Sequence, residues 1–269
     1  MERLNGKCYL VGAGPGDPGL LTVKGKECLS VADVLVYDAL SSLEFLRLVP
    51  KDCEKIYAGK RAADHAIPQG GINDLIVEKA REGKTVVRLK GGDPMIFGRG
   101  GEEAAELAEA GVPFEIVPGI SSAIGGAAYA GIPVTHRDHC SQLTLFTGHE
   151  DPSKEETSLD YAKLAAAEGT RVFLMGVSRL RKITSALIEH GADPDIPMAL
   201  TRWATTGRQR TIEGTLGSMA DIAEKEHFKS PAVAVLGDVV GERSKINWFE
   251  TRPLFGQRVV VTRTREQAG

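Results

Sequence analysis

The chain has 269 residues, 42% of them hydrophobic, which is enough for one large domain or two medium-sized ones with buried cores. Its formal net charge is −3, which argues against a general nucleic-acid or membrane-surface binder, because both need a basic field to gather polyanions. Four scattered cysteines without a C-x-x-C pair favour neither a zinc cage nor a disulfide framework, and no apolar run reaches the ~20 residues of a membrane span. We therefore expect a cytoplasmic protein that binds neither nucleic acid nor membranes.

Short apolar runs alternate with helical patterns through the first half of the chain. The runs typical of buried strands are residues 8–12, 34–38, 55–59, 85–92 and 114–119. Residues 72–83 form an amphipathic helical pattern that Gly83 is placed to stop. This alternation predicts an α/β lobe over residues 1–118, with βαβ units around a mostly parallel sheet.

The loop after the first run is rich in glycine. Gly14, Gly16 and Gly19 fall at G-x-G-x-x-G spacing, and Asp38 ends the next strand about 20 residues further on. A dinucleotide site has this pattern, in which the acidic residue holds a ribose.

Two prolines argue against that interpretation. A pyrophosphate needs backbone N–H donors from a tight turn and a helix start, and Pro15 and Pro18 each remove one donor. The helix is expected to begin only after Thr22, a suitable N-cap residue, so the turn is also too long. The loop therefore favours a nucleoside ligand without phosphates, and a purely structural turn remains an alternative.

A second glycine cluster follows the fourth run. Gly91 and Gly92 let the backbone pass close to a ligand, while Asp93 and Pro94 shape the turn. Two such loops at neighbouring strand ends predict one shared pocket.

The second half of the chain begins with a small-residue helix in residues 117–138, placed to pack closely between two lobes. Further expected strands are residues 143–148, 171–176, 210–216 and 232–240, and further expected helices are residues 160–167, 179–190 and 218–226. We expect a second α/β lobe over residues 119–250, with a mixed or parallel sheet flanked by helices and the active-site cleft between the lobes.

The last segment, residues 251–269, departs from this pattern. GQRVVVTRTREQAG starts a new apolar strand that a polar turn follows. Either it is an odd edge strand of this fold, or it begins a truncated further domain, which is the interpretation we favour.

These stretches together resemble the uroporphyrinogen-III C-methyltransferases, within the tetrapyrrole methylase family. The resemblance covers residues 7–249, and it is most specific in GGDPMIFGRGGEE and GIPVTHR. Met95 stands where the family usually has Phe, PGISSA varies the commoner PGITSA, and TRWATTGRQR matches only loosely. The segment VVVTRTREQAG likewise resembles the first strand of uroporphyrinogen-III synthase, which some organisms fuse behind this methylase.

The resemblance implies a two-lobed methylase that works as a homodimer. The implied reaction transfers methyl groups from S-adenosyl-L-methionine to two pyrrole carbons of uroporphyrinogen III, giving precorrin-2 by way of precorrin-1 in sirohaem or cobalamin biosynthesis. S-adenosyl-L-homocysteine is the second product, and no metal is needed.

The resemblance also implies a set of cofactor-binding positions whose side chains are small, apolar or acidic. These are Pro15, Gly91, Gly92, Asp93, Ile96, Ser121, Ser122, Met175 and Ala204. Glycine and serine admit close backbone contact, and Ile96 and Met175 offer apolar surface to adenine. Each has a simpler alternative: Ile96 and Met175 as core residues, and Asp93 as a turn former.

Two residues match the family's proton-transfer groups. Asp38 matches the proton acceptor and Lys60 the proposed donor. The alternatives are an N-cap or a ribose ligand for Asp38, and a solvated surface charge for Lys60.

The acidic arms of a tetrapyrrole need cationic partners. The candidates are Lys60, Arg61, Lys90, Arg99, His136, Arg137, Arg208 and Arg210. Arginine suits carboxylates because its guanidinium group binds them through two parallel hydrogen bonds. A metal site in THRDHC is disfavoured, since its spacing fits no known zinc motif. An NAD-dependent dehydrogenase and a non-catalytic nucleotide-sensing module stay open as other functions.

Overall fold

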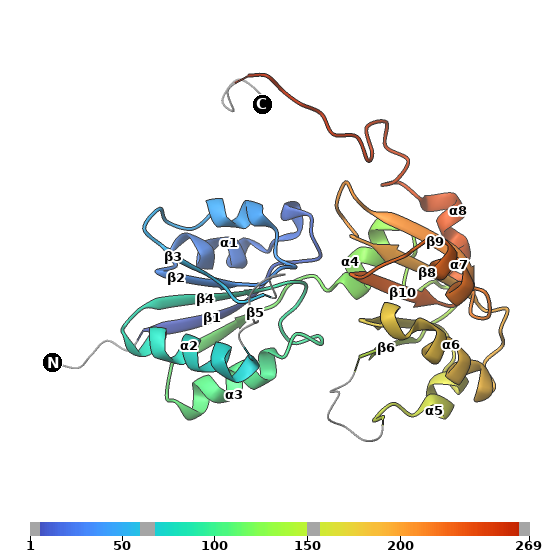
Figure 1. The fold of residues 1–269 in the computed structure, drawn as a ribbon, viewed down its shortest axis with the longest axis horizontal. Helices are drawn as coiled ribbons and strands as arrows, with labels where there is room; N and C mark the ends of the chain where they lie inside the picture. The colour runs from blue at the N-terminus through green and yellow to red at the C-terminus, as the bar shows by residue number, and fades with distance from the viewer. Residues whose placement is uncertain (1–5, 60–67, 150–156, 264–269) are drawn as a thin grey trace.

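The structure, a computed structural model, describes residues 6–59, 68–149 and 157–263. It has two α/β lobes side by side, each built on its own five-stranded sheet (Figure 1). The fold class expected from the sequence is confirmed. Among the described residues, no helix combines the length and the apolar character needed to cross a membrane.

The first lobe holds a wholly parallel sheet in the strand order β3-β2-β4-β1-β5. Its strands are β1 (Lys7–Gly12), β2 (Val34–Tyr37), β3 (Glu54–Tyr57), β4 (Thr85–Lys90) and β5 (Phe114–Val117). The central strands are continuous apolar runs because helices cover both faces of the sheet. Parallel order brings the carboxyl ends of all five strands to one edge.

Helices pack on the two faces of this sheet (Figure 1). One face carries α1 (Val23–Ser30) and the short helices η1 (Pro18–Leu20) and η2 (Leu43–Arg47). The other face carries α2 (Gln69–Arg81) and α3 (Gly100–Glu109). The α1 side buries Leu29 and Phe45, and the opposite side buries Ile76 and Leu107. As predicted, α1 begins after Thr22, whose Oγ1 accepts the N–H of Gly25 (3.0 Å). The predicted βαβ alternation implies a helix where α3 lies, but its bounds were not predicted.

The second lobe holds a mixed sheet in the order β6-β7-β10-β8-β9. Its strands are β6 (Leu143–Thr147), β7 (Thr170–Leu174), β8 (Pro197–Arg202), β9 (Arg210–Thr215) and β10 (Ala232–Leu236). Only β6 and β7 run parallel, and the other neighbours are antiparallel. The strand β8 was not expected. The expected strand at 232–240 stops at Leu236, and residues 238–242 form a short helix, η4 (Asp238–Glu242).

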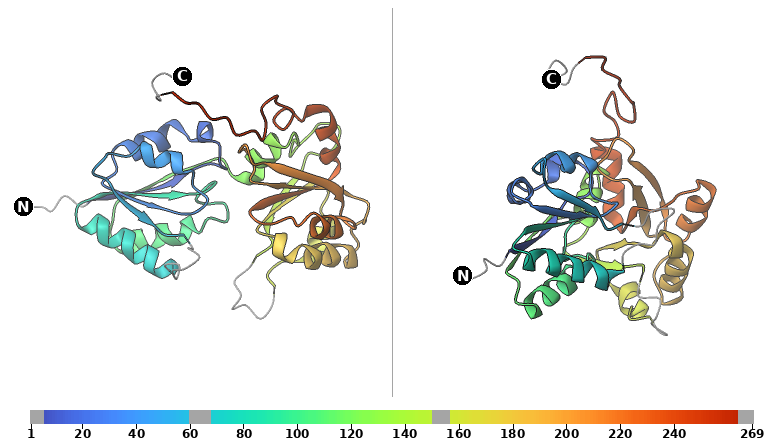
Figure 2. Two further views of the ribbon diagram at one scale, coloured as in Figure 1. Left: turned by 45° about the horizontal axis from the view of Figure 1, so that its top comes forward. Right: turned by 60° about the vertical axis from the view of Figure 1, so that its left-hand side comes forward.

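Helices also cover both faces of the second sheet. One face packs against α5 (Tyr161–Ala166), α6 (Leu180–Glu189) and α7 (Met219–Lys225); η3 (Val177–Arg179) leads into α6. The other packs against η4 and α4 (Ser122–Tyr129). Figures 1 and 2 show α4 on the side of the second lobe that faces the first. A Cβ at Gly126 would lie 3.0 Å from Val233 Cγ1, so the small residues of α4 allow its close approach to the sheet.

The predicted boundary near residues 118–120 falls between the last core residue of the first lobe, Val117, and the first of the second, Ala123. After α8 (Arg243–Ile246), the rings of Trp248 and Phe249 pack on Tyr129, and the ring of Phe255 packs on Phe249. Residues 256–263 then extend away from the second lobe (Figure 2).

The prediction of a strand after residue 257 is wrong for the described residues. Residues 257–263 adopt no strand, and Val259, Val260 and Val261 are exposed. Strand geometry is stabilised by hydrogen bonds to a neighbouring strand, and within the described chain this segment lies against none.

The close approach of three strand ends gives a stability prediction. A methyl group at Gly119 would lie 2.3 Å from the carbonyl oxygen of Gly92 and 2.7 Å from Gly12 Cα. We expect Gly119→Ala to lower the free energy of unfolding by at least about 2 kcal/mol in urea titrations, because backbone must move. Gly241→Ala is the matched control, since its Cβ meets no atom within 4 Å. Equal stability of the two variants would contradict this account.

Candidate functional site

Loops from the carboxyl ends of the parallel strands meet at one edge of the first sheet. The loop after β1 and the loop after β4 pair through Gly14 and Gly92, which exchange two backbone hydrogen bonds (3.1 and 2.8 Å). The loop after β5 joins them where Gly119 contacts Gly12 and Gly92. Ligands of open α/β sheets bind in the crevice at this edge, so these loops form the first wall of a candidate site.

The opening loop has few backbone donors left for a ligand. Pro15 and Pro18 have no N–H. The N–H groups of Ala13, Gly14, Asp17, Gly19, Leu20 and Leu21 all donate to acceptors in the protein. A pyrophosphate needs several free N–H groups, so the loop is poorly suited to one. A nucleoside has no phosphate groups, so it does not need these free N–H donors.

The Asp93 carboxylate joins two of these loops. One oxygen accepts the N–H of Met95 (2.7 Å) and the other that of Gly119 (2.9 Å). The side chain is buried. Asp93 is therefore a turn former that also fixes the loop after β5, and its negative charge lies at the same edge as the glycines.

The second lobe supplies the opposite wall. Its β8 ends at Arg202, and the following turn brings Ala204 to the opening loop: a Cβ at Gly16 would lie 3.1 Å from Ala204 O. Pro15 packs on α4, where Cγ would lie 3.0 Å from a Cβ at Gly125. The position of Ala204, which rested on the loosest sequence match, is thus next to Pro15 in space.

The structure therefore brings most of the predicted cofactor positions together. Ser121 caps α4 by accepting the N–H of Ala123 (3.3 Å), and a Cβ at Gly92 would point at Ser121 Cα and Ser122 N (3.8 and 3.9 Å). Ile96 lies in the loop after β4, directly beyond Gly91, Gly92 and Asp93. Small residues, apolar side chains and a serine hydroxyl are a chemistry that fits a nucleoside.

Met175 follows β7 at the sheet edge that also carries Trp203 and Ala204. It is exposed and has a positive φ of 58°, and Phe97, in the loop after β4, is likewise exposed with a φ of 53°. Non-glycine residues at positive φ are strained and cluster at ligand sites. Met175 is thus a residue on the site edge, and the interpretation as core is wrong for it.

Asp38 lies directly after β2, at the same edge of the first sheet. Its Oδ1 accepts the N–H of Leu40 (3.0 Å) and the hydroxyl of Ser41 (3.3 Å). Its Oδ2 lies 3.8 Å from Nη2 of the buried Arg88. One oxygen holds a turn, and the other faces the Arg88 guanidinium.

Arg88 belongs to a buried cluster of charges that the sequence did not suggest. The Glu103 carboxylate is fully buried, and its Oε1 accepts from Lys90 Nζ (2.7 Å), Arg88 Nε (3.1 Å) and Gln69 Nε2 (3.1 Å). Burial lowers the pKa of Lys90, and Arg88 lowers it further, whereas Glu103 raises it. Lys90 directly precedes Gly91, so this cluster fixes the start of the loop after β4.

The remaining predicted residues are placed elsewhere. Lys60 and Arg61 lie outside the described residues. Arg99 is exposed and pairs with Glu102 (2.6 Å).

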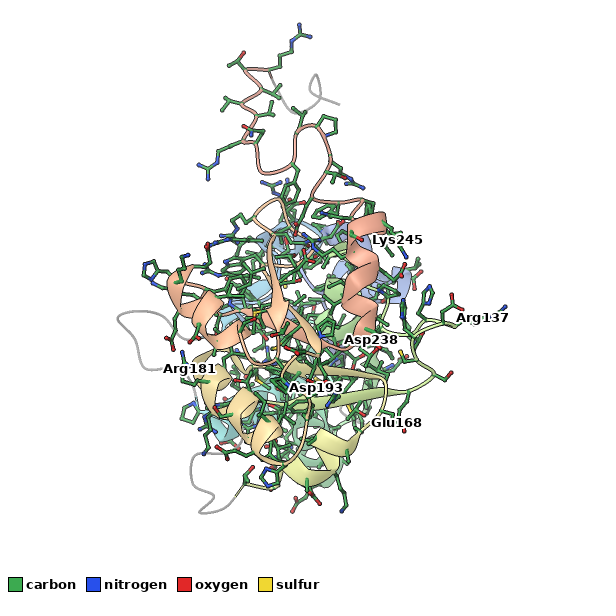
Figure 3. All side chains as sticks on the ribbon, turned by 90° about the vertical axis from the view of Figure 1, so that its right-hand side faces the viewer. Arg137, Glu168, Arg181, Asp193, Asp238 and Lys245 are labelled. Carbon is green, nitrogen blue, oxygen red and sulfur yellow. The ribbon has the colours of Figure 1, made fainter. Side chains whose placement is uncertain are left out.

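The structure does not bring His136 and Arg137 to the site. They belong to the loop before β6, where Cys140 Sγ lies 3.0 Å from Thr170 Oγ1, at the sheet edge opposite Met175. Figure 3 shows Arg137 at the periphery of the second lobe, pointing outward. Their substrate-binding role stays a prediction that this arrangement does not support.

A groove between α2 and α3 is a separate hollow on the first lobe. Its lining carries five carboxylates and one arginine: Asp74, Glu78, Glu82, Glu106, Glu109 and Arg81. An acidic groove repels polycarboxylates, so it is a poor site for an acidic tetrapyrrole.

Comparisons with known proteins find the following similarities. The model of the Tetrapyrrole (Corrin/Porphyrin) Methylases matches residues 7–220. The S-adenosyl-L-methionine-dependent uroporphyrinogen III methyltransferase of Methanosarcina barkeri (strain Fusaro / DSM 804) is 52% identical over 235 residues, which cover 87% of this chain and 92% of the relative. The uroporphyrinogen-III C-methyltransferase of Bacillus subtilis (strain 168) is 48% identical over 261 residues, covering 97% of this chain and 54% of the relative. The chain thus spans about half the length of several curated relatives.

A solved structure shares the fold. The uroporphyrin-III C-methyl transferase of Thermus thermophilus, complexed with S-adenyl homocysteine, superposes with a TM-score of 0.76 at 39% identity, covering 88% of this chain and 99% of that one.

The buried cluster gives a second prediction. Glu103→Ala removes the buried counter-charge nearest to Arg88 and Lys90, which costs about 3–5 kcal/mol of unfolding free energy. Glu106→Ala, on the exposed face of the same helix, should change it by no more than about 0.5 kcal/mol. Chemical denaturation of the two variants measures the difference, and a Glu103→Ala protein as stable as the control would refute the role of the cluster.

Proposed function

Because the chain belongs to the tetrapyrrole (corrin/porphyrin) methylase family, we propose that it is an S-adenosyl-L-methionine-dependent uroporphyrinogen-III C-methyltransferase. One observation carries the proposal: the donor-poor opening loop at the parallel edge lies against the Trp203–Thr206 turn of the second lobe at Gly16, and Asp38 lies on the same edge. The product is precorrin-2, formed by way of precorrin-1 on a route to sirohaem or cobalamin.

The cofactor would lie between the two lobes. Gly91, Gly92 and Ser122 on one side and Ala204 on the other would hold its nucleoside, with Met175 against an apolar part. When bound, the cofactor supplies an electrophilic methyl group on a sulfonium, whose C–S bond breaks with the electron pair left on sulfur. The protein therefore needs to orient the acceptor and remove one proton.

Asp38 is the residue that would take the proton. Methylation of a pyrrole carbon leaves the macrocycle with a proton to lose. Asp38 Oδ2 is proposed to accept it, because the hydrogen bonds of Leu40 and Ser41 go to Oδ1 and Oδ2 faces Arg88 at 3.8 Å. Its Oδ1 is held by Leu40 and Ser41, so the side chain is oriented before any substrate arrives. Lys60, outside the described residues, is proposed as the matching donor.

The acceptor is a polyanion, and the chain as a whole is acidic. Arg99 follows the loop after β4 and is exposed; with Lys60 and Arg61 it is proposed to bind the carboxylate arms. Lys90 is not available for that task, because its ammonium group is buried against Glu103.

Assembly and location complete the proposal. We propose a homodimer, as the resemblance implies, although α4 uses its small residues for contact within one chain. A reducing cytoplasm is supported by the four cysteines, which are all free thiols. The synthase-like segment after residue 257 stays a prediction.

Calorimetry with S-adenosylhomocysteine and with NAD tests the function. We expect binding heat with the first ligand and none with the second, because the opening loop has too few free N–H groups for a pyrophosphate. Adding uroporphyrinogen III with S-adenosylmethionine should then give turnover. Heat with NAD alone would indicate a dehydrogenase, and binding without turnover a sensing module.

Asp38→Asn separates the catalytic interpretation from the ribose-ligand one. Asparagine keeps the Oδ1 acceptor for Leu40 and Ser41 but is not a base, so we expect kcat to fall by about 10²–10⁴-fold with the affinity for S-adenosylhomocysteine nearly unchanged. Steady-state kinetics and calorimetry measure the two effects.

Asp33→Asn is the control, because Asp33 lies at the other end of β2, where its Oδ2 accepts the N–H of Thr85 (2.7 Å). It should keep full activity. Loss of cofactor affinity in Asp38→Asn would make Asp38 a ribose ligand and end the catalytic claim.

A further inference from the structure

Four residues from three segments form a closed ring of hydrogen bonds where the lobes meet. The N–H of Asp17 donates to Thr205 Oγ1 (2.9 Å), and the N–H of Thr205 donates to Gln209 Oε1 (2.7 Å). The Gln209 Nε2 donates to the carbonyl of Tyr129 (3.0 Å). The Tyr129 hydroxyl donates to Asp17 Oδ2 (2.8 Å), which closes the ring. The ring ties the opening loop of the first lobe to α4 and to the turn after β8.

The ring is sheltered from solvent. Thr205 is 3% exposed and Gln209 is 4% exposed. The Tyr129 ring packs edge-on against Trp248 and Phe249, with centroids 5.0 and 4.7 Å away. Burial and the bond to Asp17 raise the pKa of Tyr129 to about 12, so its hydroxyl remains a protonated donor. Buried polar groups that are all paired define one arrangement, because any other leaves an unpaired group.

Gln209 is the member whose chemistry is most constrained. Its amide oxygen faces a donor, the N–H of Thr205, while its amide nitrogen faces two acceptors, Tyr129 O and Glu250 Oε1 (2.9 Å). A carboxylate in the same place would set an oxygen against both acceptors. Only a carboxamide in this orientation satisfies every partner.

The turn that Gln209 holds is strained. Trp203 and Thr205 are non-glycine residues with φ of 47° and 68°. Such a conformation persists only where the surroundings fix it. The bond from Thr205 N–H to Gln209 fixes the turn, and the bond from Asp17 then fixes the opening loop to the turn.

We propose that Gln209 is a positioning residue for the cofactor, which acts by holding Ala204 at a set distance from Pro15. The inference rests on the proposed function, which gives Pro15 and Ala204 to the cofactor. Pro15 lies two residues before ring residue Asp17, and Ala204 directly precedes ring residue Thr205. Gln209 itself touches neither the cofactor positions nor Asp38.

Gln209→Glu is the variant that tests the ring, since it keeps the side-chain shape and reverses one hydrogen-bonding group. We expect the Kd for S-adenosylhomocysteine to rise about tenfold or more by calorimetry. At saturating S-adenosylmethionine, kcat should stay near the original value, because Asp38 and its contacts are untouched. Without ligand, backbone amides of residues 13–19 should exchange hydrogen faster than in the unmodified protein.

Two further variants separate positioning from general stability. Thr211→Val removes a hydroxyl that donates to Glu250 (2.6 Å) in the same cluster but outside the ring. It should lower Tm without changing the Kd. Tyr129→Phe deletes the ring bond to Asp17 with little change in packing, so it should weaken binding in a protein that still folds. Combining it with Gln209→Glu should weaken binding no more than the worse single variant.

The outcomes distinguish a failure of the proposed function from a failure of the positioning role of Gln209 alone. An unmodified protein that does not bind S-adenosylhomocysteine overturns the proposed function and the inference together. Normal binding by the unmodified protein and by both Gln209→Glu and Tyr129→Phe overturns the positioning role alone. A loss of affinity in Thr211→Val equal to that in Gln209→Glu also overturns it, because the effect would then be one of general stability.

Discussion

The contact of three backbone segments at Gly12, Gly92 and Gly119 is the constraint on which the site depends. Parallel strands deliver their carboxyl ends to one edge. A Cβ at Gly12 or Gly119 would clash with the neighbouring backbone, and Gly92 has a positive φ of 70° that favours glycine. With the glycines in place, Gly14 and Gly92 form a bridge, and Asp93 secures the loop after β5. The edge is thereby one connected surface of backbone and small side chains.

Two polar networks hold this surface from opposite sides. In the first lobe, Glu103 compensates the charges of Arg88 and Lys90, and Arg88 in turn faces Asp38. In the contact between lobes, the ring through Gln209 joins the opening loop to the turn after β8. Neither network needs to touch a ligand, yet both restrict where the ligand-facing residues can be. A site shared by two lobes requires such restraints, because only the chain between Val117 and α4 connects the lobes covalently at this edge.

The sequence predicted what short-range signals encode. Thr22 begins a helix because its hydroxyl meets the N–H three residues on, and the apolar runs became strands because both faces of the first sheet are covered. The prolines of the opening loop correctly indicated a turn with few free donors. Asp38 was placed at a strand end by its position in the run alone.

What the sequence did not predict depends on long-range contacts. Glu103 looks like any acidic residue in the first turn of a helix, and only the fold places it under Arg88 and Lys90. The bond between Asp17 and Thr205 joins residues 188 positions apart, so no local pattern could indicate it. Strand β8 was missed because a short run after Pro197 is weak evidence for a strand, and its antiparallel direction is set by β10 and β9. His136 and Arg137 were grouped with the site by motif alone, and the fold places them at the opposite sheet edge.

The central claim is that one cleft, built from both lobes, holds the methyl donor beside Asp38. A crystal structure of the protein with S-adenosylhomocysteine tests it most directly. The account predicts a nucleoside in contact with Gly92 and Ser122 on one side and with Ala204 on the other, and with its sulfur directed toward the Asp38 side of the cleft. A ligand held by one lobe alone, or seated in the acidic groove between α2 and α3, would contradict it.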